Sequence, residues 1–338
     1  MVHLVQISNG VSRCVAMVEE PRLRCLEGVE SVYEMVQACL LEGGSLSEYA
    51  RRAATGESLD YDDVYHGRSR WHLLPPIDVP GAPSRMLISG TGLTHLGSAK
   101  DRQAMHAAAT LQKAETMTDS MRIFQWGVES GRPAEGEIGI APEWFYKGNG
   151  SILRAPFAPL TVPTYGEDGG EEAELAGIYF VGPHGAPYRI GITAGNEFSD
   201  HKFEKLNYLN LAGSKLRTCS LGPELVIGAG FGSISGEVSI ERGDEVVWHK
   251  AVETGEENMC HSLANLEHHH FKFEGHRQPG DVHVHFFGAH SLSFGDGVEL
   301  RDGDWTVVRY EGFGRALRNS VSIQPKSLDR PVKVNALA

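Results

Sequence analysis

The chain has 338 residues, 41% of which are hydrophobic, and this composition provides for a large core and excludes global disorder. The formal net charge of −13 argues against a nucleic-acid partner, because binding to phosphates requires clustered Lys and Arg. No apolar run reaches the roughly 20 residues of a membrane helix, so we expect no membrane partner and a small molecule as the ligand.

Residues 1–80 are predicted to form a small α/β N-terminal domain. Two short apolar runs near the start indicate a hairpin. Apolar residues at helical spacing predict a helix over 27–43, and a second helix is expected over 45–54. The stretch 75–85 is rich in Pro and Gly and is predicted to be a linker.

Residues 81–338 are predicted to form a β-rich catalytic domain, which makes the fold class α+β. A strand over 85–92 ends in glycines and leads to helices expected over 98–114 and 117–131. Further along, glycine is frequent and short alternating runs recur, as is typical of strands. The clearest hairpin has its turn at 242–244.

The five cysteines are scattered along the chain, are odd in number and form no CxxC pair. Such spacing argues against a disulfide framework and against a zinc knuckle. The first residues lack the charged segment and apolar core of a signal peptide. These features predict reduced thiols in a cytoplasmic protein.

Three carboxylates are candidates for one site. Glu172 and Glu174 lie two apart in EEAELAGIYF (171–180), which otherwise reads as a buried strand, so both would point to one face. Glu197 follows the next predicted strand and could meet them across a hairpin. Three patterns fit: a solvated edge strand, a general acid/base pair, or a divalent-metal site, since clustered carboxylates repel one another without a cation. Glu171 is out of phase and is predicted to face solvent.

Four motifs in order, between about residue 85 and residue 322, resemble the fumarylacetoacetate hydrolase superfamily. In chain order they are PEWFYKG at 142–148, the pair E-A-E-L at 172–175 and G-N-E-F-S at 195–199, LAGSKLRTCSLGPELV at 211–226, and the closing segment from FFGAHSLSFGDG to GRALRNSV. The resemblance implies a β-rich catalytic fold described as a mixed β-sandwich roll, and a homodimer. It also implies Mg²⁺, with Mn²⁺ or Ca²⁺ as alternatives, on Glu172, Glu174 and Glu197, although most relatives have Asp at the third position.

The chain departs from the hydrolases of this family in GLTHLGSAKDRQ (92–103). Hydrolases commonly carry a His–Glu dyad there that activates water, whereas this chain has Ser98 at the His position and Asp101 at the Glu position. A serine alone is too weak a base to deprotonate water at neutral pH. The segment resembles the S-x-x-A-R region of the family's sugar-acid dehydratases and keeps Ser98 and Arg102.

The resemblance therefore implies a lyase, a metal-dependent dehydratase of a 2-keto-3-deoxy sugar acid in sugar-acid catabolism. For 2-keto-3-deoxy-L-arabinonate, in arabinose degradation, the product would be 2,5-dioxopentanoate, formed through a metal-stabilised enolate. Lys215, in LAGSKLRTCSLGPELV, is implied as the catalytic acid or base, and Glu143 as the alternative base. The residues implied to bind substrate are Ser98, Arg102, Lys147 and His290.

Several alternatives stay open from the sequence. Lys215 could be a surface lysine, Glu143 a solvated loop acid, and Arg102 an ion-pairing residue on a helix. The alternative activity is hydrolysis of a C–C bond in an acylpyruvate or 2,4-diketo acid, and a third hypothesis is a sugar-acid sensor without chemistry. The consecutive histidines at 268–270 point about 100° apart on a helix, so they cannot all face one ion.

Overall fold

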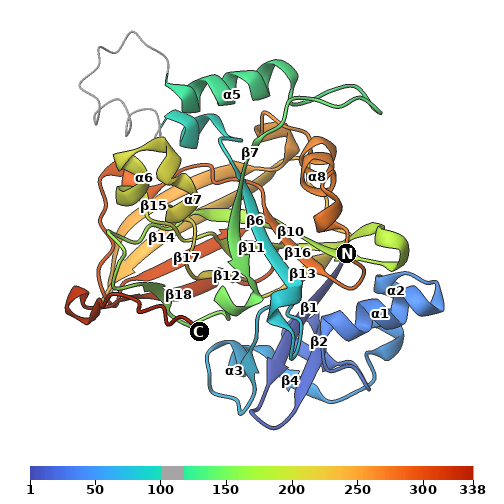
Figure 1. The fold of residues 1–338 in the computed structure, drawn as a ribbon. Coiled ribbons are helices and arrows are strands. Elements are labelled where there is room, and N and C mark those ends of the chain that lie inside the picture. Colours follow the sequence, from blue (N-terminus) through green and yellow to red (C-terminus); the bar gives the residue numbers. More distant parts are fainter. Residues whose placement is uncertain (101–117, 338) are drawn as a thin grey trace.

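The computed structural model describes residues 1–100 and 118–337 (Figure 1). The strands are β1 Val2–Ser8, β2 Arg13–Glu19, β3 Arg22–Cys25, β4 Ser58–Asp60, β5 His72–Leu73, β6 Met86–Gly92, β7 Glu143–Asn149, β8 Leu153–Arg154, β9 Leu160–Val162, β10 Ala173–Val181, β11 Pro187–Asn196, β12 Cys219–Leu221, β13 Leu225–Ile227, β14 Ile234–Arg242, β15 Glu245–Thr254, β16 Val282–Phe286, β17 Trp305–Tyr310 and β18 Leu317–Ile323. The α-helices are α1 Val32–Glu42, α2 Leu46–Ala53, α3 Tyr61–Tyr65, α5 Asp119–Ser130, α6 His201–Leu206, α7 Leu211–Ser214 and α8 Leu263–Phe271.

A large mixed sheet organises the chain. Its strands follow the order β4-β3-β2-β1-β13-β11-β10-β16-β6-β7, with β5, β8 and β12 paired at its side. Every residue of β10 is buried, as expected for a strand that has neighbours on both edges and is covered on both faces. The middle of this sheet is therefore a rigid platform for side chains at the ends of β10 and β11.

A second sheet has the order β15-β14-β17-β18-β9. The two sheets share an apolar cluster to which β10 and β11 contribute Leu175 and Ala194, and β14 and β17 contribute Val238 and Val308. The long β14–β15 hairpin turns where the Arg-Gly-Asp sequence predicts it, between Arg242 and Glu245. The β-rich α+β class predicted from the sequence is confirmed.

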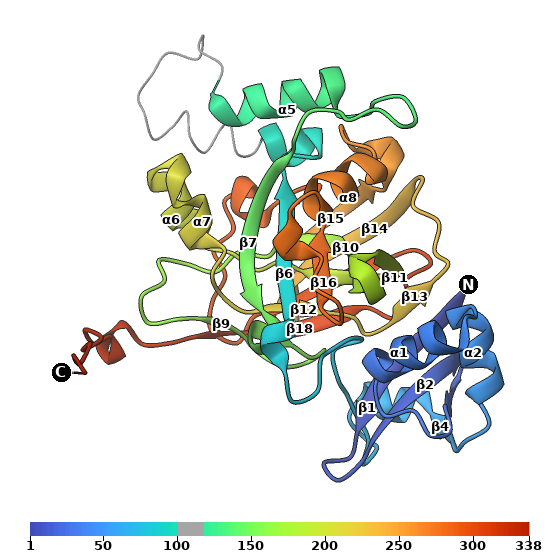
Figure 2. The ribbon, with the colours of Figure 1, turned by 45° about the vertical axis from the view of Figure 1, so that its right-hand side comes forward.

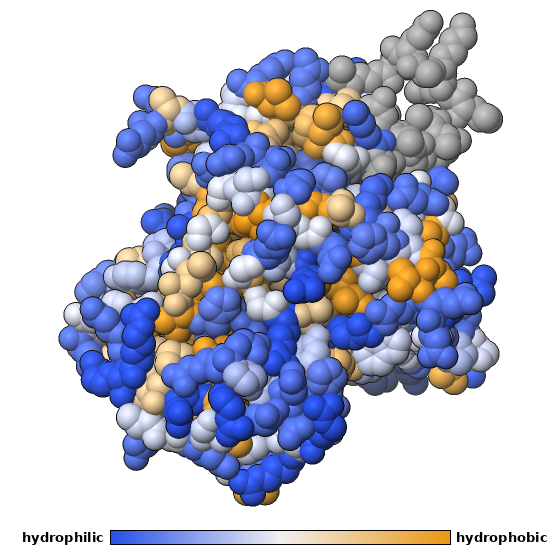
Figure 3. Space-filling view, turned by 180° about the vertical axis from the view of Figure 1, so that it is seen from behind, coloured by the Kyte–Doolittle hydropathy of each residue, from blue (hydrophilic) through white to orange (hydrophobic). Residues whose placement is uncertain are grey.

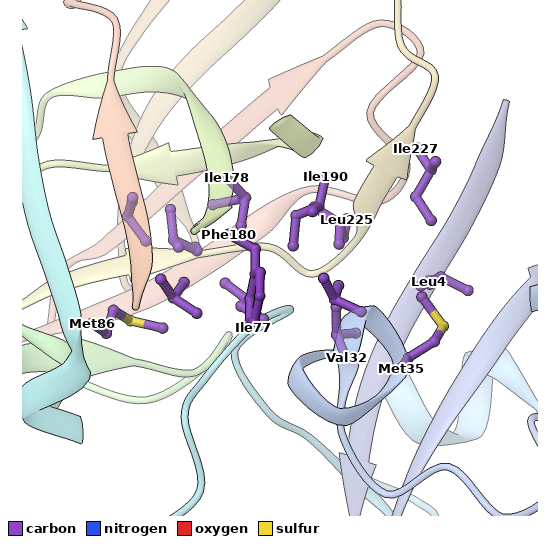
Figure 4. Close-up of a cluster of buried hydrophobic side chains, with 14 of the residues drawn as sticks. Leu4, Val32, Met35, Ile77, Met86, Ile178, Phe180, Ile190, Leu225 and Ile227 are labelled. Atoms are coloured by element: carbon purple, nitrogen blue, oxygen red, sulfur yellow. The ribbon is translucent and has the colours of Figure 1, made fainter. Parts of the chain in front are cut away.

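The N-terminal residues continue the large sheet. Strand β1 pairs antiparallel with β13, with Leu4 opposite Leu225. Figure 4 shows Leu4 and Met35 packed in the same apolar cluster as Ile227 and Phe180 from the later part of the chain. A sheet and an apolar cluster therefore connect residues on the two sides of the predicted division at residues 80 and 81, which stays a prediction.

Local sequence determines where the helices begin and end. The predicted helix over 27–43 begins later, because the Ser31 hydroxyl accepts a hydrogen bond from the backbone N–H of Glu34 and caps α1. The helix ends at Gly43, which adopts the left-handed conformation at φ 72°. Helix α2 is capped in the same way by Ser45, which accepts from the N–H of Glu48.

Figure 3 shows that the face seen from behind is mostly hydrophilic, with separate hydrophobic patches between the polar side chains. All five cysteines are buried as free thiols. The sequence analysis also expected reduced thiols. Within residues 1–100 and 118–337, the helices are too short or too polar to cross a membrane.

Candidate metal and active site

The β10–β11 hairpin brings the three predicted metal ligands together. Glu172 directly precedes β10 and Glu174 lies on it, while Glu197 directly follows β11. The backbone N–H of Glu197 donates to the carbonyl of Glu172 at 2.8 Å, which fixes the register at this end of the hairpin. One oxygen from each of the three carboxylates lies within 4.8 Å of the others, and all three side chains are buried.

Two buried lysines neutralise this negative charge. Lys215 Nζ donates to Glu172 Oε1 and to Glu197 Oε2, both at 2.5 Å. Lys147 Nζ lies 2.6 Å from Glu197 Oε1 and donates to the carbonyls of Phe198 and Lys215. Both lysines have no exposed side-chain surface, so the alternative of a surface Lys215 is wrong.

Strand β7 supplies a row of site residues from alternate positions. Glu143, Phe145 and Lys147 are buried on one face, as the two-residue period of a strand requires. The Lys215 ammonium lies 4.6 Å from the centre of the Phe145 ring. Figures 1 and 2 both place α7, which ends beside Lys215, next to β7.

Glu143 lies on β7 and is only 7% exposed, so the alternative of a solvated loop acid is wrong. Its Oε2 accepts a hydrogen bond from the Tyr208 hydroxyl at 2.8 Å. Tyr208 belongs to the turn after α6, which the sequence did not connect with the site. The carboxylate of Glu143 is therefore held in one orientation by a neutral donor.

The ordinary ionisation of the site residues is altered by burial. Burial, and then the charges of Glu172 and Glu197, raise the pKa of Glu174 well above its usual value. Glu174 Oε2 accepts one hydrogen bond, from the backbone N–H of Gly288 at 2.6 Å. Burial also lowers the pKa of Lys147, in spite of its ion pair with Glu197.

His201 is a member of the site that sequence reasoning missed. Its Nε2 lies 3.1 Å from Glu172 Oε1. Burial disfavours a charged imidazole, but the hydrogen bond to Glu172 and the charge of that residue outweigh it and raise the pKa of His201. The sequence feature that could have pointed to His201 was its position, two residues after the G-N-E-F-S motif. The structure places it in the first turn of α6.

The donor set fits a divalent cation. The three groups that converge are all carboxylates, and hard oxygen ligands suit Mg²⁺, Mn²⁺ or Ca²⁺ rather than softer ions. The cluster already holds a positive charge, the Lys215 ammonium, between Glu172 and Glu197. A site that concentrates negative charge in a buried position and compensates it with cations has the electrostatics that metal binding requires.

The prediction that Glu171 faces solvent is wrong. Glu171 is 1% exposed, and its carboxylate accepts hydrogen bonds from the Ser293 N–H at 2.7 Å and the Ser293 hydroxyl at 2.5 Å. Glu171 precedes β10, where the segment Ser293–Asp296 covers it, so strand alternation does not decide its exposure. Burial raises its pKa, against the effect of the Ser293 hydrogen bonds.

Two of the predicted substrate-binding residues, Ser98 and His290, lie in segments that pack together, while Lys147 lies on β7. Ser98 is in a helical turn at 96–100 and donates to the His95 carbonyl at 3.2 Å. Gly97 lies so close to the His290 carbonyl that a Cβ would be 2.4 Å from its oxygen, and Thr94 donates to the Phe287 carbonyl. The backbone N–H of Gly288 in the second segment donates to Glu174, so the segment 287–290 borders the carboxylates. Arg102 and Asp101 lie outside the described residues.

No family model matches the sequence, and no curated protein gives a significant match. Solved structures do match the fold. Each of the three that follow is 16% identical in sequence, and the match covers 96% of this chain and 100% of the matched chain. A 2-keto-3-deoxy-D-arabinonate dehydratase complexed with magnesium and 2,5-dioxopentanoate has a TM-score of 0.70. A fumarylacetoacetate hydrolase from Exiguobacterium antarcticum has 0.60, and a 5-carboxymethyl-2-hydroxymuconate delta-isomerase from Mycobacterium smegmatis has 0.58.

These structures share one architecture but carry different activities, and at this identity they bear on the fold alone. They confirm the resemblance that the sequence motifs indicated, at the level of the fold. The chain has the fold of the fumarylacetoacetate hydrolase superfamily, with a 2-keto-3-deoxyarabinonate dehydratase among the structures that share it.

Proposed function

We propose that the protein is an enzyme of the fumarylacetoacetate hydrolase superfamily, a lyase that dehydrates a 2-keto-3-deoxy sugar acid with a divalent cation. The observation that carries the proposal is the buried group of Glu172, Glu174 and Glu197 with Lys215 between two of its members. Catalysis of this kind needs a cation site and a proton-transfer group in the same pocket.

Glu172, Glu174 and Glu197 would hold Mg²⁺, with Mn²⁺ or Ca²⁺ as alternatives. When bound, the ion supplies Lewis acidity that stabilises negative charge on the oxygens of a 2-keto acid. Lys147 holds Glu197 in place through its short ion pair, and the Gly288 N–H orients Glu174. Substrate contact by Lys147 stays a prediction.

Dehydration requires removal of a proton from C3 and departure of the C4 hydroxyl as water. The resulting 5-hydroxy-2-oxo-3-enoate then tautomerises to 2,5-dioxopentanoate, as protons leave C5 and its hydroxyl and others are added at C3 and C4. The Lys215 ammonium, held between Glu172 and Glu197, can donate the proton with which the C4 hydroxyl leaves as water. The Glu143 carboxylate, held by the Tyr208 hydroxyl, can accept the C3 proton.

A hydrolase would need a base that activates water in the segment of Ser98. His95 is the histidine closest in sequence, but it is 1% exposed and its ring bonds Thr94 and Thr254. Burial, and then the neighbouring His290, lower the pKa of His95 to about 3, which makes it a poor base at neutral pH. This supports dehydration over hydrolysis of an acylpyruvate or 2,4-diketo acid.

The second candidate function, the C–C bond hydrolase, is favoured by one observation. His201 places an imidazole 3.1 Å from Glu172 Oε1, and a histidine beside a carboxylate is the kind of dyad that can activate water. The hydrogen bond to Glu172 and the charge of that residue raise the pKa of His201 against the effect of burial, which favours the cationic form over the free base. We therefore keep hydrolysis as the alternative.

Ser98, His290 and Arg102 are proposed to bind the hydroxyl and carboxylate groups of the substrate. A homodimer and a cytoplasmic role in arabinose or other sugar-acid degradation also stay predictions. The substrate is proposed as a five-carbon acid, because the dehydratase that shares the fold is described as acting on 2-keto-3-deoxyarabinonate.

The experiment is an incubation of the purified protein and Mg²⁺ with three compounds in parallel: the D- and L-forms of 2-keto-3-deoxyarabinonate and an acylpyruvate. Formation of 2,5-dioxopentanoate from either pentonate supports the dehydratase. Release of pyruvate from the acylpyruvate, with both pentonates unchanged, would establish the hydrolase instead. A protein inactive on all three would contradict both activities and favour a sugar-acid sensor.

A further inference from the structure

A second group of metal-ligating side chains lies outside the carboxylate site. His270 is on α8, His276 ends the turn Glu274–His276, and His283 is on β16. Their ring centres are 4.8 Å apart for His270 and His276, 5.0 Å for His270 and His283, and 5.6 Å for His276 and His283. One nitrogen from each ring lies within 4.8 Å of the other two. Figure 2 shows α8 beside β16, where these elements meet.

The run of histidines in the sequence does not itself form this group. His268, His269 and His270 diverge on the helix, as predicted, and His268 is exposed. The structure combines His270 with two histidines that follow 6 and 13 residues later. The combination depends on the return of the chain from α8 to β16, which no local pattern in the sequence indicates.

Hydrogen bonds orient His276 for ligation. Its Nδ1 lies 2.6 Å from the backbone carbonyl of His270, and a carbonyl can only accept, so Nδ1 carries the proton. The other nitrogen, Nε2, is then left with a free lone pair. This arrangement, a ring N–H on a backbone carbonyl and the opposite nitrogen available, is the one that metal-ligating histidines adopt. His276 is also partly exposed, which gives an ion a path of entry.

The other two rings share a short contact. His270 Nε2 and His283 Nδ1 are 2.9 Å apart, and the Trp144 indole N–H donates to His270 Nδ1 at 3.2 Å. Indole can only donate, so Nε2 of His270 carries its proton and donates it to His283. His283 is 1% exposed, and among the described residues its Nε2 makes no hydrogen bond.

Burial favours the neutral form of both buried rings. Burial, and then the neighbouring histidines, lower the pKa of His270, and the same causes lower the pKa of His283 to about 3. A neutral imidazole offers a lone pair, whereas a protonated one repels a cation. The cluster contains no carboxylate, so its donors suit a borderline ion rather than Mg²⁺ or Ca²⁺.

We propose that His270, His276 and His283 bind one divalent transition-metal ion of the Zn²⁺ class, with a fourth position open to water. The site is separate from the carboxylate cluster and differs from it in ligand chemistry. By joining α8, the turn after it and β16, the ion fastens the segment 271–281 to the large sheet.

Ion binding requires only a small rearrangement. Two imidazole nitrogens on a tetrahedral zinc lie roughly 3.3 Å apart, given Zn–N bonds of about 2.0–2.1 Å, against 2.9 Å between His270 and His283. The proton between these nitrogens is displaced to His270 Nδ1. Trp144 then loses its acceptor, while the Ser89 hydroxyl, 3.4 Å from the same nitrogen, can accept.

The test is a Zn²⁺ titration by calorimetry with excess Mg²⁺ present, which occupies a carboxylate site if one exists. The proteins are the wild type, His276→Gln, His283→Gln and the control His268→Gln, which alters an exposed histidine of the same run. We expect one equivalent of Zn²⁺ on the wild type and on His268→Gln. His276→Gln and His283→Gln should lose affinity by about tenfold or more.

Two spectroscopic readouts accompany the titration. Co²⁺ in place of Zn²⁺ should give visible absorption in the wild type that His276→Gln lacks. Zn²⁺ should change the tryptophan fluorescence of the wild type, and Trp144→Phe should remove that change while keeping the Zn²⁺ equivalent. Circular dichroism establishes that each variant is folded, and His276→Gln, which alters a partly exposed ring, keeps the test valid if His283→Gln does not fold.

Equal Zn²⁺ affinity in the wild type and His276→Gln would overturn the site. So would a loss in His268→Gln as large as in His276→Gln, since that would mean a surface histidine binds the ion. The outcome does not depend on catalysis, because neither Mg²⁺ nor turnover is measured.

Discussion

At the scale of single residues, buried charges in the site compensate one another. Glu172, Glu174 and Glu197 form a negative cluster whose stability in the interior requires cations, here Lys215 and Lys147. Removing one member of such a group leaves another charge without its partner, which costs more than the loss of an exposed charge. Substitutions in this cluster therefore distinguish two hypotheses, a metal site and a solvated acidic patch.

Glu174→Gln should weaken Mg²⁺ binding by more than about tenfold and abolish turnover, because an amide oxygen carries no charge for the ion. Isothermal titration with Mg²⁺ measures the binding. Glu245→Gln, an exposed acid at the start of β15, is the matched control and should bind as the wild type does. Wild-type Mg²⁺ affinity in Glu174→Gln would refute the metal site.

Ser293→Ala should lower the free energy of unfolding by about 1–3 kcal/mol, because the buried Glu171 carboxylate loses one of its donors. Urea denaturation measures this loss. Ser291→Ala is the control: Ser291 is 4% exposed, and within the described part of the chain its hydroxyl makes no hydrogen bond. Equal stability of the two variants would mean that Glu171 is not held by Ser293.

The residue-scale errors of the sequence analysis have a common physical cause. Strand alternation put Glu172 and Glu174 on one side, and the structure brings both to one cluster with Glu197. The exposure expected for Glu171 was wrong, because a turn distant in the sequence covers its carboxylate. Contacts between segments far apart in the sequence, such as His201 with Glu172, leave no local pattern.

At the scale of elements, the loop after β16 approaches the site through Gly288. This residue has φ of 100°, and a Cβ there would lie 2.0 Å from the Thr94 hydroxyl oxygen. The close approach lets its N–H reach Glu174. A glycine is therefore required both for the backbone conformation and for the contact.

Gly288→Ala should unfold the protein at a lower urea concentration and weaken Mg²⁺ binding, because the Thr94 segment and the Glu174 contact must both shift. Gly10→Ala is the control, since Gly10 also has positive φ, of 85°, but open space around its Cβ position. The control should lose only the backbone strain of about 1–2 kcal/mol and keep Mg²⁺ affinity. Equal effects in both variants would show that the packing of Gly288 has no part in the site.

Elements with strong local signals were predictable. The β14–β15 turn, the capped α2 and strand β6 lie close to their expected positions. The start of α1 was predicted too early, because the apolar periodicity extends beyond its N-cap at Ser31. The role of α6 and the following turn, which bring His201 and Tyr208 to the site, could not be predicted, because short helices carry little periodicity.

At the scale of the whole molecule, the chain packs several neutral histidines in its interior. Burial is the first cause that lowers the pKa of His95 to about 3, of His261 to about 4 and of His285 to about 3. Each binds a proton more readily in the unfolded chain. Their contribution to stability is therefore complete above pH 6.5 and is lost as the pH falls toward the folded pKa.

His95→Gln should make the fall in stability between pH 7 and pH 5 shallower, by up to about 2 kcal/mol, because one of these protonation penalties is removed. Urea denaturation of the wild type and the variant at both pH values measures the difference. Glu171 and Glu174, whose pKa values are raised, act in the opposite direction in both proteins and cancel in the comparison. An unchanged pH dependence would contradict a neutral, buried His95.

The overall fold followed from four motifs in order, while the relation of the N-terminal residues to the rest did not. The pairing of β1 with β13 joins segments more than 200 residues apart in a single sheet, a contact for which the sequence offers no local signal. The fold and the hairpin that carries the carboxylates could thus be predicted from the sequence. The contacts between distant segments that surround them could not.

The most direct test of the proposed function is proton NMR of 2-keto-3-deoxyarabinonate in D₂O with the protein and Mg²⁺. The account predicts an aldehyde signal of 2,5-dioxopentanoate and deuterium at C3, both absent with Glu174→Gln. Release of pyruvate, or an aldehyde signal of equal size with Glu174→Gln, would contradict it.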